Sequence, residues 1–393
     1  MTTPLLIIGD APSAQSGLGR ITRDLATRIH ANLSDVYEVA TLGYGGSGDR
    51  SLPFQQYAIE SMSDWFIPTL PDVWENFSGQ RKGAILTIWD ASRLLWFARP
   101  ENPQWCPDRK MRAWLAKPAP FKKWGYFPMD ATGPHGCLSV MNYECLAGYD
   151  RVLAYSEWAK DMIEESGITK NVSALPHGID TAVFRPRGRS RKVFTEGLRF
   201  GGPAIAKDEA IIGIIATNQA RKDYGLAMAA FSLIPKSVKF RVYIQTDQLE
   251  RHWSIPALLQ DYGLLDKAIV NINQVSDDMM SEIYSACDVT LGIGAGEGFG
   301  YPIFESLACG TPVITGNYGG HAEHFSPGTL ISPIARRLEG CYNCIRPVFN
   351  PQDWTNAIVR ALNAPHEDVS LLPNSLDWNN LWPRWEQWFR DAK

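Results

Sequence analysis

Two glutamates, Glu297 and Glu305, lie eight positions apart in the run Glu297-Gly298-Phe299-Gly300-Tyr301-Pro302-Ile303-Phe304-Glu305. An apolar segment at 289–293 and a small-residue loop at 294–296 precede them. Pro302 suits the first turn of a helix, because the N–H that proline lacks has no helical partner there. The pattern predicts a strand, a glycine loop and a helix start. Backbone N–H groups at that start would face phosphate or sugar oxygens, and the carboxylates would accept hydrogen bonds from hydroxyls.

This run resembles the E-x7-E motif of retaining, metal-independent glycosyltransferases of the family-4 (group 1) type. Further segments similar to that family follow in chain order at 16–20, 176–180, 221–222, 311–315 and 319–320. The C-terminal half resembles the family well, whereas residues 40–145 resemble it poorly. The resemblance implies the GT-B architecture, in which two Rossmann-like, doubly wound α/β domains face each other across a cleft. The last helix of that architecture crosses back to the first domain.

The resemblance also implies roles for individual side chains. Glu297 would contact the transferring sugar, Arg221 and Lys222 would hold the donor's diphosphate, and Glu305 would bind the ribose. Glu297 and Lys222 are therefore catalytic candidates. The family carries an arginine five positions before the lysine, where this chain has Thr217, so Arg221 would have to compensate. The other donor-binding candidates are Gly17, Gly19, Val275, Gly298, Phe299, Gly300 and Tyr301.

The sequence of the first domain contains fewer residues that match the family's site motifs. The family usually directs a histidine from this domain toward the sugar, but the segment 126–130 contains none. Asp130 is the predicted catalytic substitute, with a structural role as the alternative. Gly17 and Gly19 follow an apolar run at 5–8 and would let their loop approach the donor, although glycines serve a tight turn equally well. The acceptor-side candidates are Asp90, His135, Trp114 and Trp124.

Apolar runs and helical periodicity alternate along most of the chain. Buried strands are expected at 5–8, 84–89, 151–155, 172–175, 211–216, 240–245, 268–272, 289–293 and 312–315. Alternating strands and helices favour a doubly wound parallel sheet. Ser156 is an expected helix N-cap, and the tryptophan-rich stretch 378–389 is an expected amphipathic helix. We expect domains at 1–183 and 184–372, a hinge at about 183–200, and a C-terminal helical segment at 373–393.

Composition excludes several classes of protein. The chain has 393 residues and a formal net charge of −4, so no overall basic field would draw it to nucleic acid or membranes. Its seven cysteines are an odd number without regular spacing, which suits a reducing compartment. No secretory leader pattern and no apolar run of membrane-spanning length is present. We therefore expect a cytoplasmic protein with no membrane span.

The cysteines and histidines of the sequence do not have the spacing of known metal-binding motifs. Cys341 and Cys344 form one C-x-x-C pair without a second pair, and small buried or loop cysteines are the alternative. His321 and His324 flank a glutamate but lack the one-turn spacing of a catalytic zinc motif, so a loop or helix cap is favoured. We expect no metal and no cofactor, because a nucleotide sugar would be a co-substrate.

Two segments at 105–124 and 185–192 are rich in cations, and the first also in aromatic side chains. Such a mixture suits DNA that carries hydroxymethylated bases, aromatic residues alone suit sugar rings, and a solvated loop with core tryptophans is the remaining interpretation.

The predicted function is transfer of a sugar from a UDP-, GDP- or ADP-sugar to a hydroxyl of a glycan, a small molecule or hydroxymethylated DNA. The alternatives are a nucleotide-sugar epimerase and a non-catalytic sugar-nucleotide binder.

Overall fold

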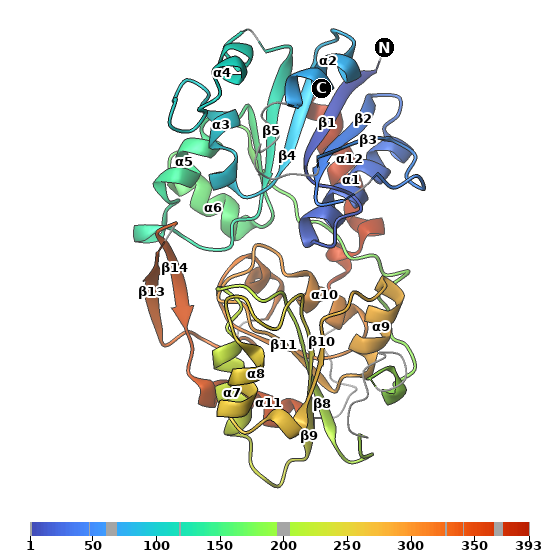
Figure 1. Cartoon of the computed structure of the whole chain (residues 1–393), viewed down its shortest axis with the longest axis vertical. Helices are drawn as coiled ribbons and strands as arrows, with labels where there is room; N and C mark the ends of the chain where they lie inside the picture. Colours follow the sequence, from blue (N-terminus) through green and yellow to red (C-terminus); the bar gives the residue numbers. More distant parts are fainter. Residues whose placement is uncertain are drawn as a thin grey trace. The chain divides into compact units, whose positions relative to one another are not determined.

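The computed structural model describes residues 2–46, 48–59, 69–117, 119–194, 205–326, 328–340, 342–364 and 372–392. The chain forms two compact units, each built on its own parallel sheet (Figure 1). The first unit comprises Met1–His177, Leu338–Ile345 and Leu381–Lys393, and the second comprises Gly178–Arg337 and Arg346–Asn380. The predicted α/β class is therefore confirmed. The units divide after His177, ahead of the expected boundary at 183, and the three-part domain division stays a prediction.

The first unit contains a seven-stranded parallel sheet in the order β3-β2-β1-β4-β5-β6-β7. The strands are β1 (Thr3–Asp10), β2 (Tyr37–Tyr44), β3 (Gln55–Ile59), β4 (Gly83–Ile88), β5 (Phe121–Phe127), β6 (Arg151–Ala154) and β7 (Val172–Ala174). Strand order reverses beside β1, which pairs with both β2 and β4. Ligands of doubly wound folds bind beyond the carboxyl ends of the strands at such a reversal.

The helices of the first unit are α1 (Gly17–Asn32), α2 (Leu70–Ser78), α3 (Leu95–Ala98), α4 (Arg109–Leu115), α5 (Val140–Leu146) and α6 (Glu157–Glu165). The N-cap predicted at Ser156 is confirmed, because its hydroxyl accepts a hydrogen bond of 3.1 Å from the Ala159 N–H. Gly167, just beyond α6, has a φ of 96°, which suits glycine at the end of a helix.

The second unit contains a five-stranded sheet in the order β10-β9-β8-β11-β12, again parallel throughout. Its strands are β8 (Ala210–Ile215), β9 (Phe240–Gln245), β10 (Ala268–Asn271), β11 (Val289–Gly292) and β12 (Val313–Thr315). Its helices are α7 (Tyr224–Ser232), α8 (Ile255–Asp261), α9 (Asp277–Ala286), α10 (Tyr301–Ala308) and α11 (Pro351–Asn363). All five predicted strands of this half are confirmed. The two-stranded sheet of β13 (Ala335–Glu339) and β14 (Cys344–Val348) was not predicted.

The last helix, α12 (Trp378–Ala392), belongs to the first unit from Leu381 onward. There the Trp385 indole N–H donates to the Pro176 carbonyl at 2.9 Å, and the Tyr37 hydroxyl donates to the Phe389 carbonyl at 2.6 Å. The return of the last helix to the first domain, expected from the resemblance, is thus observed. Within the described ranges, no helix has both the length and the apolarity needed to cross a membrane.

Candidate functional site

Three charged side chains of the second unit meet beyond the carboxyl ends of β8 and β11. Arg221 and Lys222 lie in the loop after β8, and Glu297 lies in the loop after β11. The two strands are direct parallel neighbours, so their following loops are adjacent. The Ala295 N–H donates to the Arg221 carbonyl at 2.7 Å, which fixes the loops against each other.

Glu297 binds both cations. The Arg221 guanidinium donates to Oε2 of Glu297 at 2.8 Å, and the Lys222 ammonium donates to Oε1. Burial alone would raise the pKa of Glu297, but the charges and hydrogen bonds of Arg221 and Lys222 outweigh burial and lower it to about 2. Glu297 is therefore ionised at neutral pH, and the cluster of two cations and one carboxylate carries a net positive charge.

Glycines make room for this carboxylate and hold its backbone. A Cβ on Gly294 would collide with the Glu297 carboxylate itself. Gly319 has a φ of 104°, and a Cβ there would lie 2.7 Å from the Glu297 carbonyl oxygen. The Gly320 N–H donates to that oxygen at 2.8 Å. Glu297 is thus fixed between the loop of Arg221 on one side and the Gly319-Gly320 segment on the other.

The loop then leads directly into α10. Gly300 precedes the helix with a φ of 92°, a left-handed conformation that favours glycine, and Pro302 lies in the first turn as predicted. Phe299 is buried and contacts the ring of Phe304. Gly298 and Tyr301 complete the connection. The positive end of the α10 dipole therefore begins at this loop, close along the chain to Glu297.

Glu305 lies one turn into α10 and is buried. The Tyr284 hydroxyl donates to its Oε2 at 2.8 Å, which orients the carboxylate. Val275 lies between β10 and α9 and is half-buried against the core of that region. Both residues are at the same end of the sheet as Glu297, but their ribose and base contacts stay predictions.

In the first unit, Gly17 and Gly19 form the first turn of α1. The Ser16 hydroxyl caps this helix by accepting from the Gly19 N–H at 3.0 Å. A Cβ on Gly19 would lie 2.7 Å from the Ala11 carbonyl, so close packing of the turn already requires glycine there. Ser16 also donates to Asp10, which ends β1 and was not among the predicted site residues. Asp10 could have been selected from the sequence, because it is a polar residue directly at the end of a buried strand.

Asp90 and Asp130 follow β4 and β5; β4 pairs with β1 in the sheet, and β5 pairs with β4. Asp90 forms an ion pair with Arg93 at 3.4 Å, and Asp130 is half-buried. The carboxyl edge of the first sheet therefore gathers Asp10, Asp90 and Asp130. His135 is exposed and has a φ of 67° in the turn Pro134–Gly136.

The prediction that Trp124 lies on the acceptor side is wrong. This side chain is 2% exposed and contacts the rings of Tyr37 and Trp388, so it belongs to the packing beneath α12 and offers no surface for stacking on an acceptor. Trp114 is half-buried on α4, and its ring lies 5.4 Å from that of Phe121.

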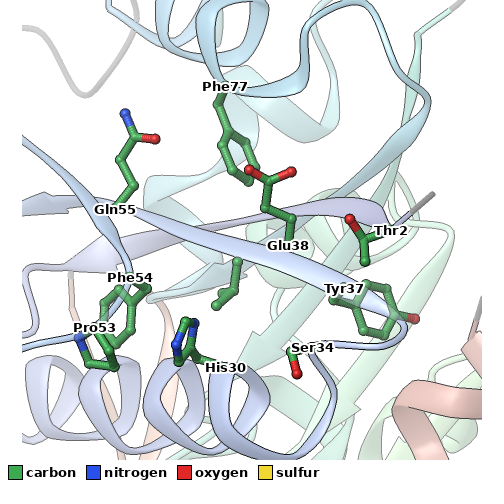
Figure 2. A pocket seen from close by; sticks show the side chains of 10 residues that line it. Thr2, His30, Ser34, Tyr37, Glu38, Pro53, Phe54, Gln55 and Phe77 are labelled. Atoms are coloured by element: carbon green, nitrogen blue, oxygen red, sulfur yellow. The ribbon is translucent and has the colours of Figure 1, made fainter.

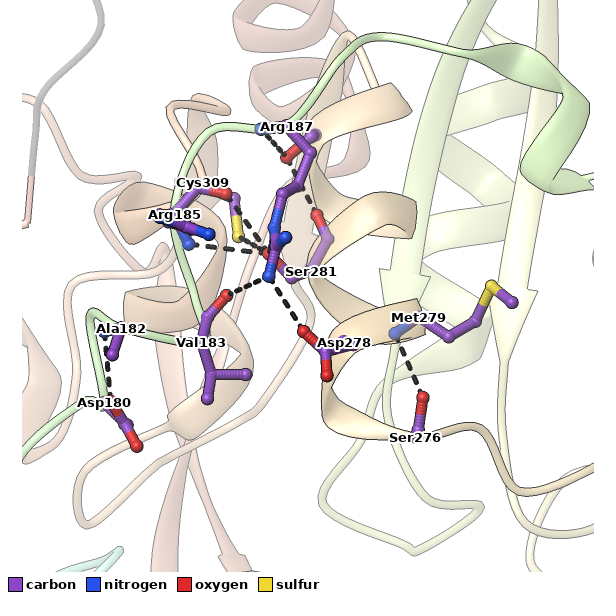
Figure 3. A network of polar contacts seen from close by, with 11 residues as sticks. Asp180, Ala182, Val183, Arg185, Arg187, Ser276, Asp278, Met279, Ser281 and Cys309 are labelled. Carbon is purple, nitrogen blue, oxygen red and sulfur yellow. Dashed lines mark hydrogen bonds and ion pairs between the residues drawn. The ribbon is translucent and has the colours of Figure 1, made fainter.

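Two basic side chains of the second cationic segment, Arg187 and Arg191, are paired within the second unit. Arg187 donates to Asp278 at 2.9 Å and to the Val183 carbonyl at 3.2 Å (Figure 3). Arg191 forms an ion pair with Asp288 at 3.3 Å. In the first segment, Lys123 donates to the Phe97 carbonyl at 2.6 Å. These contacts give Arg187, Arg191 and Lys123 structural roles. The expected hinge at about 183–200 lies partly outside the described residues.

A pocket of about 300 Å³ opens at the other end of the first sheet (Figure 2). Thr2, Tyr37 and Gln55 line it where β1, β2 and β3 begin, together with His30 and Phe77. It therefore lies away from the carboxyl ends, where sites of this fold class form.

The histidine pair forms part of a short 3-10 helix, Gly320–His324, where a loop or helix cap was expected. His321 is buried, and its Nε2 lies 3.0 Å from the Gly316 carbonyl. Cys341 lies outside the described residues, so the C-x-x-C prediction has no structural test. Among the residues that are described, no three His, Cys, Asp or Glu side chains are grouped as metal ligands. Metal independence stays a prediction.

Comparison with known proteins finds similarity to glycosyltransferases. Residues 199–370 match the family model described as glycosyl transferases group 1. The D-inositol 3-phosphate glycosyltransferase of Acidothermus cellulolyticus is 27% identical over 189 residues, which cover 45% of this chain and 40% of that protein. The mannosylfructose-phosphate synthase of Agrobacterium fabrum is 25% identical over 44% of this chain and 38% of its own length. The chain thus spans less than half the length of these relatives.

Solved structures extend the likeness to both units. Sucrose-phosphate synthase from Thermosynechococcus elongatus superposes with a TM-score of 0.74 at 17% identity, covering 99% of each chain. Anabaena HepE, solved with UDP and glucose, gives a TM-score of 0.68 at 13% identity over 99% of this chain and 100% of its own. At such identities the likeness shows the fold. The chain has the GT-B fold of glycosyltransferases, and its residues 199–370 match the group 1 glycosyltransferase family.

Proposed function

We propose that the protein is a glycosyltransferase that moves a sugar from a nucleotide-sugar donor to a hydroxyl acceptor, with retention and without a metal. The observation that carries this proposal is the cluster of Arg221, Lys222 and Glu297 beside the start of α10. A cationic cluster next to a helix N-terminus suits a diphosphate, and a carboxylate in the same cluster suits the hydroxyls of the attached sugar. The family match of residues 199–370 and the names of the relatives also support a glycosyltransferase enzyme.

The chemistry requires stabilisation of a leaving diphosphate. The bond between the anomeric carbon and the phosphate oxygen breaks, and the acceptor oxygen forms its bond to that carbon on the same face. The proton of the acceptor hydroxyl passes to the leaving phosphate oxygen, so no side chain has to act as a strong base. Arg221 and Lys222 would stabilise the negative charge that grows on the phosphate, an effect that is strong where water is excluded.

The remaining assignments are carried over from the family resemblance. The backbone of Gly298–Tyr301 would lie under the sugar and phosphates, Glu305 would hold the ribose, and Val275 would contact the base. Arg221 binds Glu297 directly, which supports its role as a substitute for the arginine missing at Thr217. Asp130 stays the candidate catalytic residue of the first domain.

The acceptor is proposed to be a glycan or a small molecule. The similarities give no support to a DNA acceptor, and three cations of the basic segments, Arg187, Arg191 and Lys123, serve contacts within the protein. Two of the relatives bear names that contain a phosphorylated polyol or sugar, which makes such compounds the first acceptors to test. No cofactor is proposed beyond the co-substrate, and a cytoplasmic location stays a prediction.

Donor binding by the wild-type protein and by Glu305→Ala tests the proposal. Titration with UDP-, GDP- and ADP-glucose should reveal one preferred donor for the wild-type protein. Glu305→Ala should bind it about tenfold or more weakly, because buried hydrogen bonds to a charged group are strong. Glu282→Ala, which removes an exposed carboxylate on α9, is the matched control. Unchanged affinity in Glu305→Ala would remove the ribose assignment, and no binding of any donor would remove the proposed function.

A further inference from the structure

Glu297 is the shared partner of both cations that are assigned to the donor's diphosphate. We propose that Glu297 competes with the diphosphate for Arg221 and Lys222, and thereby makes the protein discriminate the intact donor from the nucleoside diphosphate product. This inference rests on the proposed function, since it concerns the same site, and it adds a specificity role for Glu297.

The competition follows from how the hydrogen bonds are distributed. Each carboxylate oxygen of Glu297 accepts from a different cation, Oε2 from Arg221 and Oε1 from Lys222. A diphosphate offers anionic oxygens that need the same N–H donors. The side chains of Glu297 and Lys222 are 9% and 10% exposed, so little water is present to screen the charges. A diphosphate that enters this cluster therefore has to share or replace the contacts of Glu297.

Backbone hydrogen bonds around the cluster hold Glu297 close to Arg221 and Lys222. The Gly320 N–H holds the Glu297 carbonyl, and the Ala295 N–H holds the Arg221 carbonyl. Lys222 and Gly294 also form an antiparallel bridge. With both loops fixed in this way, Glu297 can leave the cations only by rotation of its side chain. Its backbone is therefore held beside the cations, so that the side chain has to share them with a bound diphosphate.

The sugar of the donor changes how strongly Glu297 competes with the diphosphate. In the donor complex the hydroxyls of the sugar would donate to Glu297 and replace the hydrogen bonds that it gives up to the diphosphate. After transfer these hydroxyls leave with the product, and the carboxylate is again left with Arg221 and Lys222 as its donors. The nucleoside diphosphate then competes with the carboxylate for these same donors, which weakens its binding and speeds its release.

A purely structural counter-ion role makes a different prediction. If Glu297 only keeps Lys222 charged and in position, Glu297→Gln would weaken the binding of donor and nucleoside diphosphate by similar factors. Competition instead requires the two ligands to respond in opposite directions or by clearly different factors.

The test is calorimetric titration of the wild-type protein and Glu297→Gln with UDP, GDP and ADP and with the corresponding glucose donors. For the preferred base, we expect Glu297→Gln to bind the nucleoside diphosphate about fivefold or more tightly, because a negative charge has left the cluster. Its affinity for the donor should stay the same or fall. The ratio of the two dissociation constants should then shift by about fivefold or more in favour of the diphosphate. Inorganic pyrophosphate, which lacks sugar and base, should follow the nucleoside diphosphate.

Glu282→Gln, an exposed change on α9, is the control and should match the wild-type protein for every ligand. Equal changes for donor and diphosphate, or weaker diphosphate binding by Glu297→Gln, would overturn the inference and leave the proposed function standing. Failure of the wild-type protein to bind any nucleotide would overturn the proposed function itself. Circular dichroism of Glu297→Gln shows that the compared proteins are folded.

Discussion

At the scale of single residues, the site depends on charges that are buried together. Lys222 is 8% exposed as a residue and Glu297 7%, and neither would be stable there as an isolated charge. Their pairing, with Arg221 as the third member, explains why the pKa of Glu297 falls although burial favours the neutral acid. The same pairing concentrates positive charge where a diphosphate would bind.

Lys222→Met tests the assignment of the cation. Removal of the ammonium should lower kcat by on the order of 100-fold, since charge that develops on the leaving group loses a preorganised partner. The measurement is steady-state turnover with the preferred donor. Lys239→Met is the control, because Lys239 is an exposed lysine of the same unit that pairs with Asp208. Similar turnover in both variants would show that Lys222 takes no part in the chemistry.

The lowered pKa of Glu297 predicts how stability depends on pH. The folded pKa of about 2 lies below the ordinary value of 4.5, so the ionised side chain stabilises the folded state fully above about pH 4.5. This contribution is lost as the pH falls from about 4.5 toward about 2. Glu297→Gln should therefore unfold at a lower urea concentration than the wild-type protein at pH 7, and the difference should shrink across that window. A difference that stays constant down to pH 3 would contradict the ion pair.

At the scale of elements, loops after neighbouring parallel strands bring the charges together. The β8–β11 pairing makes the loops of Lys222 and Glu297 adjacent although they are distant in sequence. The Gly319-Gly320 segment after β12 closes the arrangement, because its backbone lies against the carbonyl of Glu297. Loop geometry, more than helix packing, should therefore control donor affinity.

Gly319→Ala tests this dependence on the loops. The φ of 104° and the close Glu297 carbonyl leave no room for a methyl group, so the loop has to shift. We expect donor affinity to fall about tenfold or more, because displacement of positioning groups by even 1 Å is costly. Gly340→Ala is the matched control, since a Cβ there meets no atom within 4 Å. Equal donor affinity in both variants would show that the Gly319 contact does not position Glu297.

The tryptophan-rich helix α12 allows a prediction for stability. Trp385 is fully buried, lies 5.0 Å from the ring of Tyr126 and donates to the Pro176 carbonyl. Trp385→Ala should lower the free energy of unfolding by about 3–5 kcal/mol, the usual result of removing a large core side chain. Urea denaturation measures this loss. Trp114→Ala, at a half-buried position, should lose much less, and an equal loss in both would contradict the assigned packing of α12.

The strands that could be predicted from the sequence are those whose apolar runs are continuous. Strands β1, β4 and β8 meet this condition most clearly, because a parallel strand covered on both faces is largely apolar. Strand β7, at the edge of the sheet with Ser173 in its middle, is an exception. Strand β5 starts with Phe121 and Trp124 separated by two lysines, so its sequence resembled a basic surface segment. Strand β3 is an edge strand that is exposed or half-buried along its length, and it lacks an apolar run.

Some features of the candidate site could likewise be predicted from the sequence and others could not. Arg221, Lys222, Glu297 and Glu305 could be selected because family motifs mark them. Their ion pairs could not be predicted, since they depend on the order of strands in the sheet. Trp124 was misassigned because nothing local indicates that α12, more than 250 residues later, covers it.

At the scale of the whole molecule, the chain has the GT-B fold, and its residues 199–370 match the family model of group 1 glycosyl transferases. The second unit supplies the charged cluster, and the carboxyl edge of the first sheet supplies Asp10, Asp90 and Asp130. Acidic side chains at that edge suit an acceptor with several hydroxyls. This division of roles predicts that donor-site variants change nucleotide affinity, whereas Asp130→Asn changes turnover and leaves nucleotide affinity unaltered.

Nucleotide release from UDP-, GDP- and ADP-glucose, measured in the presence of EDTA, tests the central claim most directly. The wild-type protein should release nucleotide from one donor without a metal, faster when phosphorylated polyols or sugars are added as acceptors. The anomeric proton of the new glycoside, followed by NMR, should show retained configuration, and Lys222→Met should release nucleotide at least about 100-fold more slowly. Release that stops with EDTA, an inverted product, or no release from any donor by the wild-type protein would contradict metal-independent, retaining transfer.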